Sequence, residues 1–232
     1  MVGVLCGLLG VLYNKAILAG LRIGDRSRVP VVSRAVAIGV AVGLVGWFAP
    51  SWVGTGDGLT QAALSGGGAL GAVLLVFVVR FALGVGSYAA NAPGGLFAPM
   101  LVLGSHAGLA VGLALSVFTP LAPGTTAALA LIGMAAFFTA SVQAPVTGVI
   151  LASEMTGSVT WLPPMLGTVA IAMLIAMLLG SEPIYDALTT RAARNAEKNR
   201  EEEATDEPSR PSPSGSPLGG LDDDGFSAVR PR

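Results

Sequence analysis

The sequence has few charged side chains and almost none of the residues that build metal sites or disulfides. Only 12% of its 232 residues are charged, whereas a soluble domain has about 25%. Residues 191–232 hold 7 of the 13 basic and 9 of the 14 acidic residues, which leaves 6 and 5 for the first 190. A segment with so few charges would not stay in solution. This excludes a soluble enzyme, a nucleic-acid binder and a secreted disulfide-linked domain.

Cysteine and histidine each occur once. Cys6 lies in an apolar run and has no second cysteine to pair with, so there is no disulfide framework. With His106 as the one histidine, we expect no metal site. The N-terminus has no basic start and no small-residue cleavage site before Lys15, so a signal peptide is not expected either.

Apolar residues make up 53% of the chain and gather in six long stretches. A helix needs about 20 apolar residues to span the hydrocarbon core. We therefore predict an all-α, polytopic membrane protein. The stretches cover roughly residues 2–20, 33–50, 69–89, 95–119, 125–152 and 160–180.

Several stretches are short or are interrupted by proline and glycine, as at Pro99, Pro145 and Pro183. Broken helices at membrane depth are tolerated only where protein buries them or where they line a polar cavity. Such segments therefore point to an ion or substrate pathway. The alternative is that glycine and proline are simply commoner in membrane helices than in soluble ones.

Basic residues indicate the orientation. Five of them fall in or beside the loop that joins the first two stretches, against the single acid Asp25, so this loop is predicted to be cytoplasmic. Arg191 and Arg194 follow the last stretch and predict a cytoplasmic C-terminus. The five basic residues are Lys15, Arg22, Arg26, Arg28 and Arg34.

The composition changes near Asn195. Residues 195–232 are rich in Glu, Asp, Pro, Ser and Gly and cannot bury enough apolar surface to fold. We predict a transmembrane domain over residues 1–194 and a disordered cytoplasmic tail over 195–232.

The segment 91–100, NAPGGLFAPM, predicts a helix that begins near Leu96 inside the membrane. The first N–H groups of a helix have no internal partner, and no Ser, Thr, Asp or Asn stands next to these to cap them. The glycine pair would let an anion approach them, with no lysine or arginine nearby. An ordinary Gly-Pro turn before a membrane span is the alternative.

Three further features carry weaker signals. Pro145 to Met155 predicts a half-helix of about 16 Å that ends at Glu154, either a functional acid or an interfacial carboxylate. Tyr185 follows Glu182-Pro183 in the first turn of a helix, where it is an interfacial residue or a hydroxyl donor. Arg80 interrupts an apolar span and must pair with an acid or with carbonyls, or else attract anions.

Together these segments resemble the chloride channel (CLC) family of chloride channels and chloride/proton exchangers. GGLFAP at 94–99 is similar to the G-G-x-F-x-P anion-site motif of the family. APVTGVILASEM at 144–155 is similar to its A-P-x-[TA]-G-x-x-x-x-x-E-[ML] stretch, and EPIYDAL at 182–188 to its closing helix. GVLYNK at 10–15, GWFAP at 46–50 and GTGDG at 54–58 fit the C-terminal half of the family in order and spacing.

The resemblance implies a fold and roles for single residues. The chain would be the second inverted repeat of a CLC-type fold, over about residues 1–195. Leu96 and Phe97 would donate backbone N–H groups to chloride, and Tyr185 its hydroxyl. Apart from the resemblance, Glu154 and Arg80 are expected from their positions in the sequence to be structural or gating residues. The residues that shape the helix start would be Gly94, Gly95 and Pro99.

The chain departs from the family pattern in one large respect. The first-half motifs G-S-G-I-P and G-[KR]-E-G-P do not occur in it. Half a binding site is therefore present, and a lone half would expose polar helix ends to lipid. Glu154 looks like the pseudo-symmetric counterpart of a proton-pathway glutamate in the missing half, which does not make it a proton carrier.

The resemblance thus implies a chloride transporter, either a voltage-gated-type channel or a chloride/proton antiporter. By the same resemblance it is expected in the cell membrane as a homodimer, with chloride as its ligand, no cofactor and no enzymatic activity. The alternative is a truncated, non-transporting remnant, or one subunit of a split transporter that needs the N-terminal half. An intramembrane hydrolase built on Ser105 and His106 is disfavoured, because adjacent helical residues do not face each other.

Overall fold

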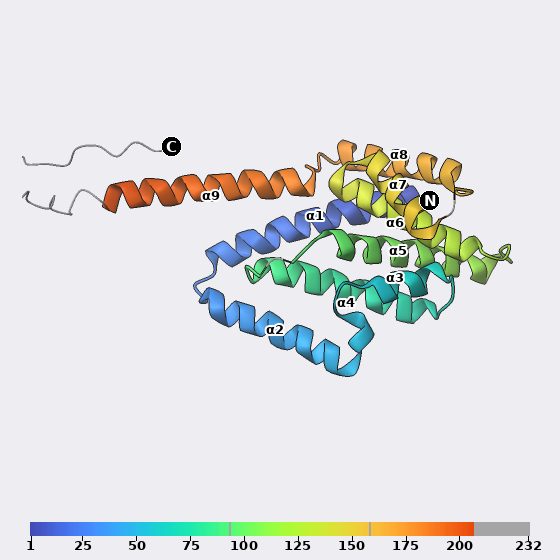
Figure 1. Ribbon diagram of the computed structural model, residues 1–232, viewed down its shortest axis with the longest axis horizontal. Helices are drawn as coiled ribbons and strands as arrows, with labels where there is room; N and C mark the ends of the chain where they lie inside the picture. The colour runs from blue at the N-terminus through green and yellow to red at the C-terminus, as the bar shows by residue number, and fades with distance from the viewer. Residues whose placement is uncertain (93, 158, 207–232) are drawn as a thin grey trace, which may run out of the picture. The chain divides into compact units, whose positions relative to one another are not determined.

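The computed structural model describes residues 1–92, 94–157 and 159–206, and all regular secondary structure in these ranges is helical (Figure 1). This confirms the predicted all-α class. The chain divides into two compact units, Met1–Leu188 and Thr189–Arg232. The elements are α1 Val2–Arg26, α2 Val31–Phe48, the 3-10 turn η1 Pro50–Trp52, α3 Asp57–Leu64, α4 Leu70–Ala89, α5 Phe97–Phe118, α6 Thr125–Val142, α7 Pro145–Thr156, α8 Leu162–Leu178 and α9 Ile184–Asp206.

Within the described residues, five helices are long and apolar enough to cross a membrane: α1, α2, α4, α5 and α6. A sixth apolar helix, α8, is shorter. The stretch predicted over 125–152 is broken at Gln143, which takes a left-handed conformation with φ of 59°. The predicted half-helix is confirmed, since α7 starts at Pro145 and has 12 residues. Proline suits the first helical position because its missing N–H would have no partner there.

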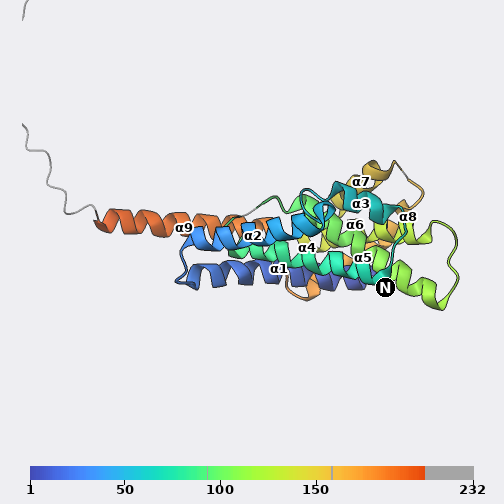
Figure 2. The same ribbon diagram turned by 90° about the horizontal axis from the view of Figure 1, so that it is seen from below.

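The core of the first unit forms around α6. This helix contacts α1, α5, α7 and α8, and it is buried along most of its length. At the other extreme, α2 has no buried residue and contacts α4 and η1 on its inner side. Both views show α2 lying along α4 (Figures 1 and 2). An apolar face so exposed marks a surface that contacts lipid or other protein.

The tightest helix contact joins α5 to α6. A Cβ atom added to Gly108 would lie 2.0 Å from the carbonyl oxygen of Leu129 on α6. A Cβ on Gly133 would lie 2.5 Å from the carbonyl oxygen of Gly104 on α5. Glycine at these places lets two membrane helices approach until their backbones touch, which is how such helices gain packing energy without a hydrophobic force.

The C-terminal segment differs from its prediction in part. Disorder was predicted from residue 195, but α9 continues as a helix to Asp206. This stretch is rich in Ala, Glu, Lys and Arg, which favour helix, and its oppositely charged residues recur three apart, as at Arg194 and Glu197. The first compact unit ends at Leu188, six residues before the predicted boundary. The rest of the predicted tail, 207–232, lies outside the described residues.

We predict that Gly108→Ala destabilises the protein by about 1–3 kcal/mol, because the added methyl group forces α5 and α6 apart. The apparent melting temperature of the detergent-solubilised protein, followed by size-exclusion chromatography, measures the effect. The control is Gly39→Ala on α2, where a Cβ meets nothing within 4 Å. Alanine favours helix over glycine, so this control should melt no lower than the wild type. Equal melting temperatures for the two variants would contradict the prediction.

Candidate functional site

The N-terminus of α5 carries free backbone donors. The helix starts at Phe97, with Leu96 as its N-cap residue and no side-chain cap. The first N–H to find a helical partner is that of Met100, which donates to the carbonyl of Leu96 at 3.1 Å. Among the described residues, the N–H groups of Leu96, Phe97 and Ala98 have no hydrogen-bond acceptor. The predicted uncapped helix start near Leu96 is therefore present.

Open space surrounds the glycine pair that precedes α5. A Cβ on Gly94 or Gly95 would meet no atom within 4 Å. Leu96 is buried, while Phe97 is 41% exposed and packs edge-on against Phe138 of α6, with ring centroids 5.6 Å apart. A small ligand can thus reach the backbone beside the free N–H groups.

Tyr88, near the end of α4, holds the glycine pair in place. Its hydroxyl donates a 2.8 Å hydrogen bond to the carbonyl of Gly94. The turn between them is closed by the N–H of Ala92, which donates to the carbonyl of Ser87, and Asn91 takes a positive φ of 57°. The sequence analysis missed Tyr88. One signal could have found it: Asn91, three residues after Tyr88, is a residue type that tolerates the left-handed conformation, which predicts a turn that brings Tyr88 back towards Gly94.

A cavity of about 170 Å³ adjoins this helix start. Its polar lining consists of hydroxyl, guanidinium and backbone groups, and none of its lining residues is acidic. Such a lining favours an anion over a cation. The residues come from α1, α2, α4, the loop after η1 and the start of α5: Tyr13, Val42, Val53, Gly54, Arg80, Leu83, Gly84, Ser87, Tyr88, Gly94, Gly95, Leu96 and Pro99.

Arg80 is 7% exposed and bonds to carbonyls. Its Nη1 donates to the carbonyl of Gly54 at 2.8 Å and its Nη2 to that of Val53 at 3.3 Å. Its Nε has no hydrogen-bond partner among the described residues. Of the two kinds of partner expected for this residue, acid or carbonyl, the printed bonds are to carbonyls. They tie the loop after η1 to the middle of α4 and keep a positive charge beside the cavity.

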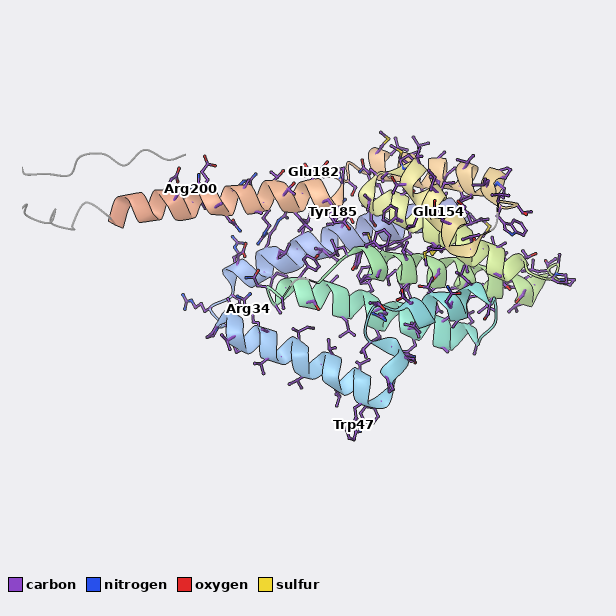
Figure 3. All side chains as sticks on the ribbon, viewed as in Figure 1. Arg34, Trp47, Glu154, Glu182, Tyr185 and Arg200 are labelled. Atoms are coloured by element: carbon purple, nitrogen blue, oxygen red, sulfur yellow. The ribbon has the colours of Figure 1, made fainter. Side chains whose placement is uncertain are left out.

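Tyr185 lies in the first turn of α9, as predicted, and is 41% exposed (Figure 3). Its hydroxyl makes no hydrogen bond among the described residues. Burial raises the pKa of Tyr185, so the hydroxyl keeps its proton and can donate at neutral pH. Tyr185 does not line the 170 Å³ cavity.

Two amide side chains position the turn that leads into Tyr185. Asn14 of α1 is 1% exposed, and its Nδ2 donates to the carbonyls of Ser141 at 2.9 Å and Glu182 at 3.3 Å. Gln143, between α6 and α7, donates from Nε2 to the carbonyl of Ser181. The sequence analysis missed both residues. The only signal for Asn14 was a polar amide inside an apolar run.

Glu154 and the Ser105–His106 pair lie elsewhere. Glu154 is exposed in the last turn of α7 and does not line the cavity (Figure 3). His106 is buried, and its Nδ1 lies 2.9 Å from the carbonyl oxygen of Val102. A carbonyl only accepts, so Nδ1 carries the proton and cannot accept the hydroxyl proton of Ser105, 3.4 Å away. The pair therefore lacks the nucleophile–base geometry of a hydrolase.

Five of the eight predicted site residues thus meet at one cavity: Gly94, Gly95, Leu96, Pro99 and Arg80. Phe97, Tyr185 and Glu154 do not line it. Phe97 is nonetheless the next residue of the same helix start. The structure therefore brings Arg80 next to the start of α5, whereas no hydrogen bond among the described residues joins Tyr185 or Glu154 to this start.

Comparison with known proteins gives consistent results. A family profile described as "Voltage gated chloride channel" matches residues 1–177. The H(+)/Cl(-) exchange transporter ClcA of Cronobacter sakazakii is 35% identical over 210 residues, which covers 88% of this chain and 44% of the relative. ClcA of Salmonella typhimurium is 33% identical over 209 residues, covering 86% of this chain and 44% of the relative.

The fold also matches a solved structure. The crystal structure of a slow cyanobacterial Cl⁻/H⁺ antiporter is similar with a TM-score of 0.75 and 30% sequence identity. The match covers 82% of this chain and 45% of that one. The chain therefore spans less than half the length of the relatives that it matches.

We predict that Arg80→Met destabilises the protein by about 1.5–3 kcal/mol, because the carbonyls of Val53 and Gly54 lose a charged donor. The melting temperature of the detergent-solubilised protein should fall by several degrees. Arg22→Met removes an exposed arginine and serves as the control, with no change expected. If the two variants have the same melting temperature, the two hydrogen bonds from Arg80 to carbonyls do not stabilise the fold.

Proposed function

Because the chain belongs to the voltage-gated chloride channel family, we propose that it forms part of a chloride pathway across the membrane, with the anion held at the start of α5. The observation that carries the proposal is the uncapped start of α5, whose free N–H groups lie beside open space at Gly94 and Gly95. Transport, with no chemistry on a substrate and no cofactor, is the activity that such a site supports.

The anion would be held by neutral donors. The N–H groups of Leu96 and Phe97 point along the helix axis, where the helix dipole adds a partial positive charge. The hydroxyl of Tyr185 would supply a third donor, since it has no other hydrogen bond among the described residues. A site without a direct ion pair binds chloride yet releases it, which conduction requires.

Arg80 and Glu154 have supporting roles in this proposal. Arg80 raises the local anion concentration through its charge, while its carbonyl bonds keep it from binding chloride tightly. Glu154 is a structural residue at an exposed position in the last turn of α7. Gly94, Gly95 and Pro99 set the backbone path into the helix.

Coupled exchange is favoured over channel conduction. The similar proteins are an H(+)/Cl(-) exchange transporter and a Cl⁻/H⁺ antiporter. On this basis we infer that chloride movement through the complete protein is accompanied by protons in the opposite direction. A pH electrode outside proteoliposomes, read during a chloride gradient, would register this movement.

The complete pathway needs more polypeptide than this chain, because the relatives are more than twice as long as the part matched. We infer that a segment equivalent to their remaining length faces the start of α5, on the same chain or on a second one.

We also infer a homodimer with its C-terminus in the cytoplasm, as the basic residues after the last span suggest. Native mass spectrometry of the protein from its own membranes should show an even number of copies of this segment. An odd number, or a single copy, would contradict the homodimer.

We predict that Gly95→Leu in the protein from its own membranes abolishes chloride flux into proteoliposomes, because the side chain fills the space through which the anion approaches. Gly167→Leu on α8 is the matched control, since its Cβ position is also open and no residue of α8 lines the cavity. We expect its flux to equal that of the wild type. If Gly95→Leu carries as much chloride flux as this control, the anion does not bind at the start of α5.

For Tyr185→Phe we expect chloride affinity to fall about tenfold, which corresponds to about 1.4 kcal/mol for one hydrogen bond to an anion. Isothermal titration of the solubilised protein with chloride measures it. Ser116→Ala, which removes an exposed hydroxyl at the opposite end of α5, should leave the affinity unchanged. An unchanged affinity in Tyr185→Phe would exclude its hydroxyl as a ligand.

A further inference from the structure

Exposed arginines and exposed apolar side chains alternate where α1 ends and α2 begins. Arg22, Arg26 and Arg28 are all exposed. Between and after them stand Ile23, which is 69% exposed, and Val32, which is 74% exposed. A mixture of this kind is typical of a surface at the boundary between hydrocarbon and lipid headgroups.

An apolar groove of about 360 Å³ begins beside these arginines. It runs between α1, α2 and α4 and exists because its walls are built mainly of small residues: Gly24, Ala37, Ala41, Gly86, Ala89 and Ala90. None of its lining residues is acidic. Because α2 has no buried residue, the groove opens sideways from the bundle within the apolar spans. At that depth an acyl chain matches the apolar lining of the groove.

A second, polar pocket of about 280 Å³ adjoins the groove and shares Gly24, Arg34 and Ala89 with it. Arg34 stands at the junction, where α1 and α2 meet (Figure 3). Its Nη1 donates to the carbonyls of Gly24 at 2.6 Å and Ala89 at 3.2 Å. Its Nε is buried and has no hydrogen-bond partner among the described residues. A guanidinium with donors to spare therefore faces a polar pocket on one side and an apolar groove on the other.

We propose that this composite site binds one anionic phospholipid, with an acyl chain in the groove and the phosphate at Arg34. The exposed Arg26 and Arg28 select a headgroup that carries a net negative charge. A guanidinium donates charge-assisted hydrogen bonds to the oxygens of a phosphate. Every phospholipid has this phosphate, so the preference for an anionic lipid rests on the net charge of its headgroup. Asp25 also lines the polar pocket, so the phosphate lies on the arginine side of it.

Two rival occupants fit less well. Free phosphate would use the polar pocket but leave the apolar groove unfilled. A zwitterionic phospholipid would fill the groove, but its headgroup has no net charge to gain from three exposed arginines. The site lies in the first compact unit alone and does not depend on chloride transport.

Native mass spectrometry of the purified protein tests the proposal, with dioleoyl-phosphatidylglycerol and dioleoyl-phosphatidylcholine added separately at the same concentration. We expect at least fivefold more protein to retain phosphatidylglycerol than phosphatidylcholine. The double variant Arg26→Gln, Arg28→Gln should lower phosphatidylglycerol retention to the phosphatidylcholine level. Its control, Arg194→Gln with Arg200→Gln, removes two exposed charges from α9 and should retain the lipid as the wild type does.

A second variant tests the groove. Ala37→Phe places a ring in it and should lower retention of both lipids at least threefold. Val40→Phe, on the same helix but outside the groove lining, should change neither. Equal retention of the two lipids by the wild type, or unchanged retention in either test variant, would overturn the proposal. So would glycerol phosphate competing as well as the intact lipid, because the groove would then take no part.

Discussion

The close contact of α5 with α6 is the constraint on which the rest of the first unit depends. Gly104, Gly108 and Gly133 let the two backbones touch, and any side chain there would push the helices apart. A helix is a rigid rod, so fixing its middle against the buried α6 also fixes where its first turn lies. The free N–H groups at Leu96 and Phe97 are therefore held in place by packing two to three helical turns away.

Polar side chains then satisfy backbone groups that the broken helices leave open. Arg80 donates to the carbonyls of Val53 and Gly54, Arg34 to those of Gly24 and Ala89, and Asn14 to those of Ser141 and Glu182. In hydrocarbon each unsatisfied carbonyl would cost several kcal/mol, so these donors make the irregular backbone tolerable. In these three cases the unpaired backbone groups are carbonyl oxygens, and the side chains donate to them. At the start of α5 the unpaired backbone groups are N–H donors, which need an acceptor. An anion is the partner that suits them.

Much of this arrangement was predictable from local sequence. Proline at 145 predicted the start of α7, and the absence of any capping residue near Leu96 predicted an open helix start. The role of carbonyls as partners of Arg80 was one of two predicted outcomes. The prediction of disorder from residue 195 differs from the structure over residues 195–206, which are helical. The reason is that Glu, Lys, Arg and Ala are common in disordered segments and also favour helix. Tyr88, Asn14 and Gln143 were missed because nothing near them in the sequence shows what they bond to.

The sequence by itself determined which segments are apolar enough to cross a membrane, where they break and which helix start lacks a cap. These properties depend on runs of neighbouring residues, since apolar length and proline position act locally. Only the tertiary structure decided that Arg80 adjoins that helix start, that Asn14 reaches carbonyls 127 and 168 residues away, and that a basic loop borders an apolar groove. Those outcomes depend on how closely the helices pack, and at Gly108 and Gly133 the missing side chain sets that distance.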